Sequence, residues 1–168
     1  LLLNRKVRCY PKLCSVLVYP STYVARNEND EKSVRLGESW QSGAVVLAWD
    51  SVKHGAANFA DGHNLVIHEF AHQLDQEDGS GDGAPLLAGP SRYAPWARVL
   101  SGEYARHCKR VGSGKKSVID AYGAVNPAEF FAVASETFFE KPRQLKMKHA
   151  DLYDELQQFY QVDPLEWT

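Results

Sequence analysis

A segment of eleven residues constrains the fold of this chain more than any other part of its sequence. Residues 64–74, NLVIHEFAHQL, place their apolar side chains at the spacing of one helix face. The rest of this predicted helix carries His68, Glu69 and His72, so two histidines lie one helical turn apart. The fold must therefore bury the apolar face while it keeps both imidazoles on the other side.

The spacing of the two histidines suits a metal ion. Residues four apart on a helix lie about 40° apart around its axis, so His68 and His72 can bind one common ion. Glu69 points about 100° away from His68, where it can reach a ligand of that ion without binding the ion itself. This is the H-E-x-x-H arrangement, in which two histidines hold Zn²⁺ and the glutamate is the general base for the bound water. The sequence therefore predicts zinc binding, with a helix that contains histidines by coincidence as the alternative.

A catalytic zinc ion usually has three protein ligands and one open position, so a third ligand is needed. No histidine follows His72 at the spacing of the metzincin class, because the sequence there reads QLDQEDG. Glu129, at the start of EFFA in a later predicted helix, can supply a carboxylate, although with Asn126 it also fits a helix-capping box. Glu136 lies seven residues later on the same helix face and is the competing ligand. We favour Glu129 as the third ligand and Glu136 as a supporting partner.

The order of the predicted elements favours the α+β fold class. Two apolar segments rich in β-branched residues read as strands, and a polar loop or hairpin separates them. Amphipathic segments follow as helices, with a start signal at Asn126-Pro127 and a stop at Pro142. Strands followed by helices indicate α+β rather than a doubly wound α/β sheet. The predicted strands are residues 15–24, broken at Pro20, and 43–52, the loop is residues 26–33, and the helices are residues 64–74, capped by Asn64 or Asp61, 91–111, 126–142 and 149–160.

Length, charge and cysteine content exclude several classes of protein. The chain has 168 residues, about the size of one domain, and its formal net charge of −2 gives no reason to expect nucleic acid as a partner. No apolar run approaches the roughly 20 residues of a membrane helix, and LLLNRKVR at the start is too short and too charged for a signal peptide. Three cysteines, an odd number, suit a reducing compartment, so we expect a cytoplasmic protein. Cys9 and Cys14 are expected to be free, partly buried thiols rather than zinc ligands.

Two further motifs lack a required residue. DGSGDG, residues 78–83, begins like a calcium loop, but the twelfth position is Gly89, so we expect a flexible loop beside the cleft. GSGKKS, residues 112–117, lacks the upstream glycine of a phosphate loop and reads as a solvated basic turn. Closer to the histidines, Asp75 either accepts a hydrogen bond from an imidazole or solvates the helix end, and His63 reads as a surface or capping residue.

Several segments together resemble one known family. HEFAHQLD, SVIDAYGAVNPAEFFAVASETFFEKP and YQVDP are similar to the Mlc titration factor A family, bacterial zinc metallopeptidases of the gluzincin type with a catalytic core similar to that of anthrax lethal factor. The resemblance covers nearly all of the chain, including VLVYPSTYV and GESWQSGAVVLAWD. It implies a zincin-like metallopeptidase domain, in which a short sheet accompanies an active-site helix and C-terminal helices. Family members carry a further N-terminal segment, so residues 1–168 are expected to form a single catalytic domain without it.

The resemblance also implies roles for individual residues. His68, His72 and Glu129 are then the ligands of one Zn²⁺ per chain, and the glutamate between the histidines is the catalytic base. Tyr122, seven residues before the third ligand, is implied to stabilise the oxyanion with its hydroxyl group. From the residues alone, Tyr122 is equally well explained as a core tyrosine beside Ile119.

The chemistry of these residues indicates a zinc-dependent peptidase that acts on a peptide or protein. The resemblance favours an aminopeptidase, while endopeptidase action, side-chain preference and a non-peptide substrate stay open. The alternative is a regulatory binding protein, because the resemblance also implies sequestration of a transcriptional repressor of sugar uptake, with zinc mainly structural. The intact Glu69 favours the enzyme, since a structural zinc ion needs no base within the motif.

Overall fold

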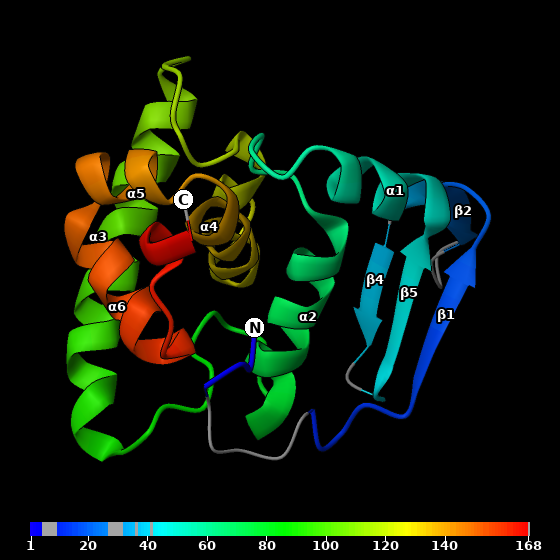
Figure 1. Ribbon diagram of the computed structural model, residues 1–168, viewed down its shortest axis with the longest axis horizontal. Coiled ribbons are helices and arrows are strands. Elements are labelled where there is room, and N and C mark those ends of the chain that lie inside the picture. Colours follow the sequence, from blue (N-terminus) through cyan, green and yellow to red (C-terminus); the bar gives the residue numbers. More distant parts are fainter. Residues whose placement is uncertain (5–9, 27–31, 36, 41, 168) are drawn as a thin grey trace.

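The computed structural model describes residues 1–4, 10–26, 32–35, 37–40 and 42–167, in which strands come first and helices follow (Figure 1). The chain therefore has the predicted α+β class. The strands are β1 (Ser15–Tyr19), β2 (Tyr23–Arg26), β3 (Lys32–Arg35), β4 (Gly37–Trp40) and β5 (Ala44–Ala48). The α-helices are α1 (Trp49–Ala57), α2 (Leu65–Asp75), α3 (Tyr93–Gly112), α4 (Pro127–Glu140), α5 (Pro142–Lys148) and α6 (Ala150–Tyr160). Short 3-10 helices are η1 (Gln76–Asp78), η2 (Pro90–Arg92), η3 (Ala121–Ala124) and η4 (Pro164–Trp167).

Strand β5 is the centre of a three-stranded sheet, with β1 parallel on one side and β4 antiparallel on the other. The apolar residues 45–48 of β5 are buried, whereas all five residues of β1 are exposed. Strands β2 and β3 form a separate antiparallel pair. Figure 1 shows the three-stranded sheet on one side of the molecule and α3, α5 and α6 on the other, with α2 between them. Helix α2 contacts β4 and β5 as well as α4, so it joins the two parts.

Of the two strand predictions, one agrees with the structure and the other needs correction. Residues 15–24 form β1 and β2, interrupted at Pro20 as expected. The prediction that residues 43–52 are one strand is wrong after Ala48, because α1 begins at Trp49. Asp50 stands in the first turn of α1, where a carboxylate suits the positive end of the helix dipole.

The polar segment between the predicted strands is shorter than expected. Strands β2 and β3 pair as a hairpin, so Arg26 and residues 32–33 belong to strands rather than to the loop. The connection, residues 27–31, lies outside the described residues. Strands β3 and β4 have no sequence signal of their own, because KSVR and GESW are short and lack apolar alternation.

The four predicted helices correspond to α2, α3, α4 and α6, each within two residues of its expected bounds. Helix α5 has no counterpart among the predictions. Pro142 ends α4 as expected, but it also starts α5, because a proline suits the first turn of a helix.

The core lies around α4. Phe131 and Phe138 of this helix are fully buried, and the ring of Phe131 packs edge-on against Trp96 of α3 and Phe159 of α6. Further apolar side chains of α3 and α6 join this core, among them Val99, Leu100, Leu152 and Leu156. Because α4 directs its phenylalanines into this core, its opposite side is free to carry polar residues toward α2.

The structure describes two of the three cysteines, Cys14 and Cys108. Cys14 is exposed next to the exposed strand β1, so the prediction of partial burial is wrong for this residue, and Cys9 lies outside the described residues. Cys108 is half-buried on α3.

In the described part of the chain, no helix combines the length and the apolar character needed to cross a bilayer.

Candidate metal centre

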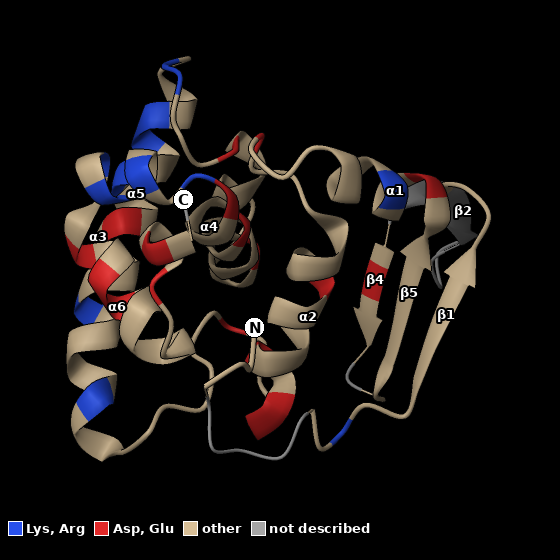
Figure 2. Cartoon of the chain, viewed as in Figure 1, with Lys and Arg blue, Asp and Glu red and all other residues tan. Residues whose placement is uncertain are grey.

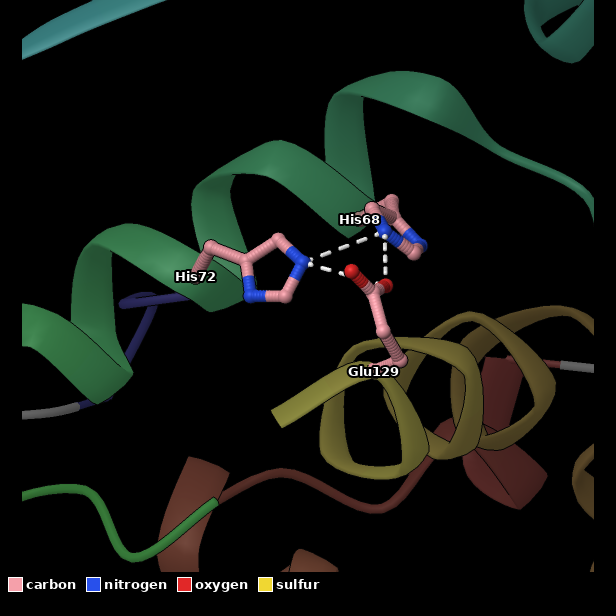
Figure 3. A group of neighbouring side chains, drawn as sticks. All are labelled: His68, His72 and Glu129. Atoms are coloured by element: carbon pink, nitrogen blue, oxygen red, sulfur yellow. Dashed lines mark hydrogen bonds and ion pairs between the residues drawn. The ribbon is translucent and has the colours of Figure 1, made fainter. Parts of the chain in front are cut away.

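Helices α2 and α4 bring three potential metal ligands together (Figure 3). His68 and His72 lie one turn apart on α2, and Glu129 extends toward them from the first turn of α4. Glu129 Oε2 is 3.0 Å from His68 Nε2 and 3.4 Å from His72 Nε2, and the two Nε2 atoms are 3.2 Å apart. Within the described ranges, these side chains are the one group of His, Cys, Asp and Glu residues compact enough to hold a metal ion.

The three atoms fit a zinc ion in spacing and in chemistry. Ligands at about 2.0–2.2 Å from a tetrahedral zinc ion are about 3.3–3.6 Å from one another. The observed distances of 3.0, 3.2 and 3.4 Å are close to this range. Two imidazole nitrogens and one carboxylate oxygen are also ligand types that zinc takes. Glu129 Oε2 is buried without a well-aligned hydrogen bond from the described residues, so a cation at this point would satisfy it.

In the metal-free protein, contacts between histidines and carboxylates set the charges. Burial lowers the pKa of His68, but its contacts with Glu129 and Glu136 outweigh burial and raise the pKa to about 10. Burial raises the pKa of Glu129, but its contacts with His68 and His72 outweigh burial and lower the pKa to about 2. A protonated His68 is therefore the counter-ion of Glu129, and a bound metal ion must replace that proton.

Glu136 contacts the other nitrogen of His68. Its Oε1 atom lies 2.8 Å from His68 Nδ1, whereas Nε2 of the same ring faces Glu129. Its Oε2 atom accepts a hydrogen bond from the backbone N–H of Asn64. A carboxylate in this place fixes the tautomer and the orientation of a metal-binding imidazole. This geometry agrees better with the predicted supporting partner than with the competing third ligand.

The start of α2 is attached to α4 by a second carboxylate. Of the two predicted caps, Asn64 is the one observed, because its Oδ1 atom accepts a hydrogen bond from Ile67 N–H. Asn64 Nδ2 donates to Glu140 Oε1 over 3.0 Å, and Glu140 Oε2 accepts from the backbone N–H of Gly62. Glu140 and Glu136 lie one turn apart on α4, so both hold the end of α2 that precedes the histidines.

Replacing Asn64 with alanine should lower the free energy of unfolding by about 1–2 kcal/mol. The variant loses the helix cap and the side-chain hydrogen bond to Glu140. Urea unfolding of the metal-free protein measures the loss. Asn64→Ser keeps a capping oxygen and should recover most of the stability, whereas an alanine variant as stable as the parent would show that the cap contributes nothing.

Glu69 lies on the side of α2 that faces strand β4, and it is 5% exposed. Burial is the largest influence on this group and raises the pKa of Glu69 to about 7, a value that suits a general base near neutral pH. Gly37 of β4 makes room for the carboxylate, because a Cβ atom at this position would lie 2.5 Å from Glu69 Oε1 and 2.7 Å from Leu65 Cδ1. Nothing in the local sequence around Gly37 links this residue to Glu69.

A cavity of about 1050 Å³ opens beside these side chains, and Tyr122 of η3 is among the residues that line it. Tyr122 is 52% exposed, so its interpretation as a core tyrosine is wrong, whereas its neighbour Ile119 is buried. The ring centroids of Tyr122 and His68 are 6.0 Å apart. Tyr122 therefore lies beside the group of ligands, as the oxyanion role requires.

The lining of the cavity is acidic. The carboxylates of Glu38, Asp50 and Asp120 line it in addition to those near the histidines, and none of the lining residues in the described chain is lysine or arginine. Figure 2 shows basic residues on α3 and α5, away from α2. The cavity therefore favours positively charged molecules.

Asp75 differs from both expectations. Its side chain is fully buried, so the prediction that it solvates the helix end is wrong, and burial raises its pKa to about 6. Among the described residues, the hydrogen bonds that its carboxylate accepts come from Gly83 N–H, at 2.9 and 3.0 Å. Asp75 thus holds the loop of residues 78–83 against the end of α2.

The other polar positions behave largely as predicted. His63 is exposed at the cavity, with Nε2 3.8 Å from Asp120 Oδ2. In the loop that resembles a calcium site, Asp78 accepts hydrogen bonds from Ser80, and Gly81 lines the cavity. Lysines 115 and 116 are exposed, as expected of a solvated basic turn.

Comparisons with known proteins agree with a metallopeptidase. A family model described as glucose-regulated metallo-peptidase M90 matches residues 1–161. An uncharacterized protein of Synechocystis sp. is 41% identical over 165 residues, covering 93% of this chain and 60% of that protein. Mlc titration factor A of Escherichia coli O17:K52:H18 is 36% identical over 169 residues, and that of strain K12 / DH10B is 37% identical over 164 residues. Both alignments cover 90% of this chain and 60% of the relative, so the chain spans about 60% of the length of these proteins.

Proposed function

This chain belongs to the glucose-regulated metallo-peptidase M90 family, and from that membership we propose that it is a zinc-dependent peptidase with a zincin-like catalytic domain. The observation that carries the proposal is the convergence of His68, His72 and Glu129 beside the buried carboxylate of Glu69. A structural metal site needs no neighbouring base and no cavity. Here both accompany the ligand group.

His68, His72 and Glu129 would hold the zinc ion, and Glu136 would keep the His68 ring in orientation. When bound, zinc supplies a Lewis acid that activates water and polarises a carbonyl group. Glu69 accepts a proton from the attacking water and returns it to the leaving amine. The Tyr122 hydroxyl donates a hydrogen bond to the carbonyl oxygen as negative charge develops there.

Two features of the cavity support a peptide substrate with a free amino group. Strand β4 is an edge of the three-stranded sheet, and Gly37 and Glu38 line the cavity. Edge strands offer backbone groups to which an extended peptide can bind. The carboxylates of Asp50 and Asp120 favour an ammonium group, which agrees with an aminopeptidase.

A regulatory binding function is the second candidate. Two of the relatives carry the name Mlc titration factor A, which associates those proteins with Mlc. On this alternative, the chain binds a transcriptional repressor and the metal serves mainly as structure. The regulatory alternative does not explain why the carboxylate of Glu69 is buried beside Gly37, and we therefore favour the peptidase.

Cleavage of a mixed library of free and N-blocked peptides tests the proposal. Zinc-loaded protein should cleave peptides with a free amino group from the amino end and should not cleave N-blocked peptides. Protein from which a chelator has removed the zinc should be inactive. Cleavage of blocked peptides would indicate an endopeptidase. Protein that binds zinc stoichiometrically and cleaves nothing would favour the regulatory candidate.

Replacing Tyr122 with phenylalanine should lower kcat by roughly 10²- to 10³-fold, because one hydrogen bond to the developing oxyanion is lost. The zinc content should not change, since Tyr122 is not among the three ligands. Steady-state kinetics and metal analysis measure the two quantities. Tyr93→Phe is the matched control, because Tyr93 is also exposed but does not line the cavity. Loss of zinc from the Tyr122 variant would assign the residue a structural role.

A further inference from the structure

His107 of α3 is a buried histidine that the proposed mechanism does not use. It is 2% exposed, and burial lowers its pKa, so the neutral imidazole is the form expected near pH 7. Its Nε2 atom lies 3.0 Å from the backbone oxygen of Asp120, whereas Nδ1 has no hydrogen-bond partner among the described residues. A buried polar atom without a partner is unfavourable, so simple core packing would be better served by an apolar side chain.

The contact to Asp120 fixes the tautomer of His107. A carbonyl oxygen only accepts hydrogen bonds, so Nε2 must carry the proton and donate it. The donated bond joins α3 to the turn η3, which contains Tyr122. His107 thus anchors η3 to α3.

Asp120 closes this turn with both its backbone and its side chain. Its backbone oxygen accepts from Gly123 N–H over 3.1 Å, and its Oδ1 atom accepts from Tyr122 N–H over 2.8 Å. The bond from His107 therefore reaches the residue that determines the conformation of the whole turn.

Close packing leaves this turn little freedom. A Cβ atom at Gly123 would lie 3.4 Å from His107 Nε2 and 3.5 Å from Phe130 Cα, which is van der Waals distance, so the turn packs closely against both α3 and α4. The ring centroids of His107 and Phe130 are 5.7 Å apart. The imidazole is thus fixed from the side of α4 while it donates to the turn.

From this arrangement we infer that His107 is a positioning residue, which holds Tyr122 at the cavity through its hydrogen bond to the backbone of Asp120. The inference rests on the proposed function for the role of Tyr122, but the positioning itself is a property of the fold. His107 is neither a member of the ligand group nor itself a lining residue of the cavity, and its hydrogen bond reaches the lining only through the backbone of Asp120. Its substitution should therefore disturb Tyr122 and leave metal binding unchanged.

Amide hydrogen exchange, measured by NMR on the metal-free protein, tests the positioning. His107→Leu fills a similar space without a donor, and the amides of Tyr122, Gly123 and Val125 should exchange about tenfold faster or more. His107→Gln keeps an N–H donor and should retain protection within a few-fold of the parent. The amide of Ile67, at the start of α2, should be unaffected in both variants. Faster exchange spread evenly over all helices, or equal behaviour of the two variants, would overturn the inference.

Kinetics supply a second readout on the zinc-loaded protein. His107→Leu should lose kcat to the same extent as Tyr122→Phe, with KM and zinc content unchanged, and the double variant should be no slower than Tyr122→Phe alone. Losses that multiply in the double variant would contradict the shared role. If the parent cleaves no peptide, the proposed peptidase function fails, while the exchange measurement still decides the place of His107.

Discussion

Replacing Glu69 with glutamine should abolish most peptide cleavage while zinc remains bound. General acid–base catalysis contributes a factor of about 10²–10⁴ to the rate, so we expect kcat to decrease by a factor in that range. Glutamine has nearly the same shape as glutamate and fits against Gly37, but it cannot accept the proton from water. Because Glu69 is not one of the three ligands, the affinity for zinc should change only a few-fold.

The measurement combines kcat with a zinc competition titration on the same samples. Glu38→Gln is the matched control, because Glu38 is another carboxylate in the lining of the cavity. Its kcat should remain within a few-fold of the parent. Rapid cleavage by Glu69→Gln would remove the base from the mechanism, and loss of zinc from this variant would mean that Glu69 is a ligand.

Replacing Glu129 with alanine should weaken zinc binding more than any other single change on α4. Structural zinc sites contribute about 10–16 kcal/mol of apparent binding free energy, so one of three ligands accounts for about 3–5 kcal/mol, or roughly 10³-fold in affinity. Glu136→Ala removes a hydrogen-bond partner of His68 and should lower the affinity for zinc about 10- to 100-fold. Glu140→Ala, which affects only the start of α2, should cost less.

Competition with a chelator of known affinity measures all three variants. The expected order of the losses in zinc affinity follows from the position of each carboxylate. Glu129 lies near the Nε2 atoms of both histidines, whereas Glu136 contacts only Nδ1 of His68. If Glu136→Ala lost more zinc than Glu129→Ala, the two glutamates would have to exchange roles.

The parts of the site that depend on local spacing could be predicted from the sequence. The apolar periodicity of residues 64–74 defines α2, and the four-residue spacing brings His68 and His72 to one side of it. The proposed third ligand is harder to predict, because Glu129 and Glu136 lie on the same face of α4 and local spacing cannot distinguish them. Only the position of α4 against α2 separates the glutamate that faces Nε2 from the one that faces Nδ1.

Most features that the sequence does not predict depend on contacts between distant segments. Strand β4 exists because it pairs with β5, and its sequence GESW gives no sign of this. The role of Gly37 depends on the approach of β4 to α2, and that of His107 on the approach of η3 to α3. The boundary between β5 and α1 at Trp49 is hard to predict for a local reason, because one continuous apolar run extends across it.

The contact between Gly37 and Glu69 gives a criterion for sorting related sequences. A methyl group at position 37 would meet the carboxylate of Glu69 and the side chain of Leu65, yet neither is a zinc ligand. A homologue with a larger residue there would keep its H-E-x-x-H motif and its metal while its base is displaced. If Glu69 is the base of the proposed peptidase, we therefore expect glycine at this position in those relatives that catalyse.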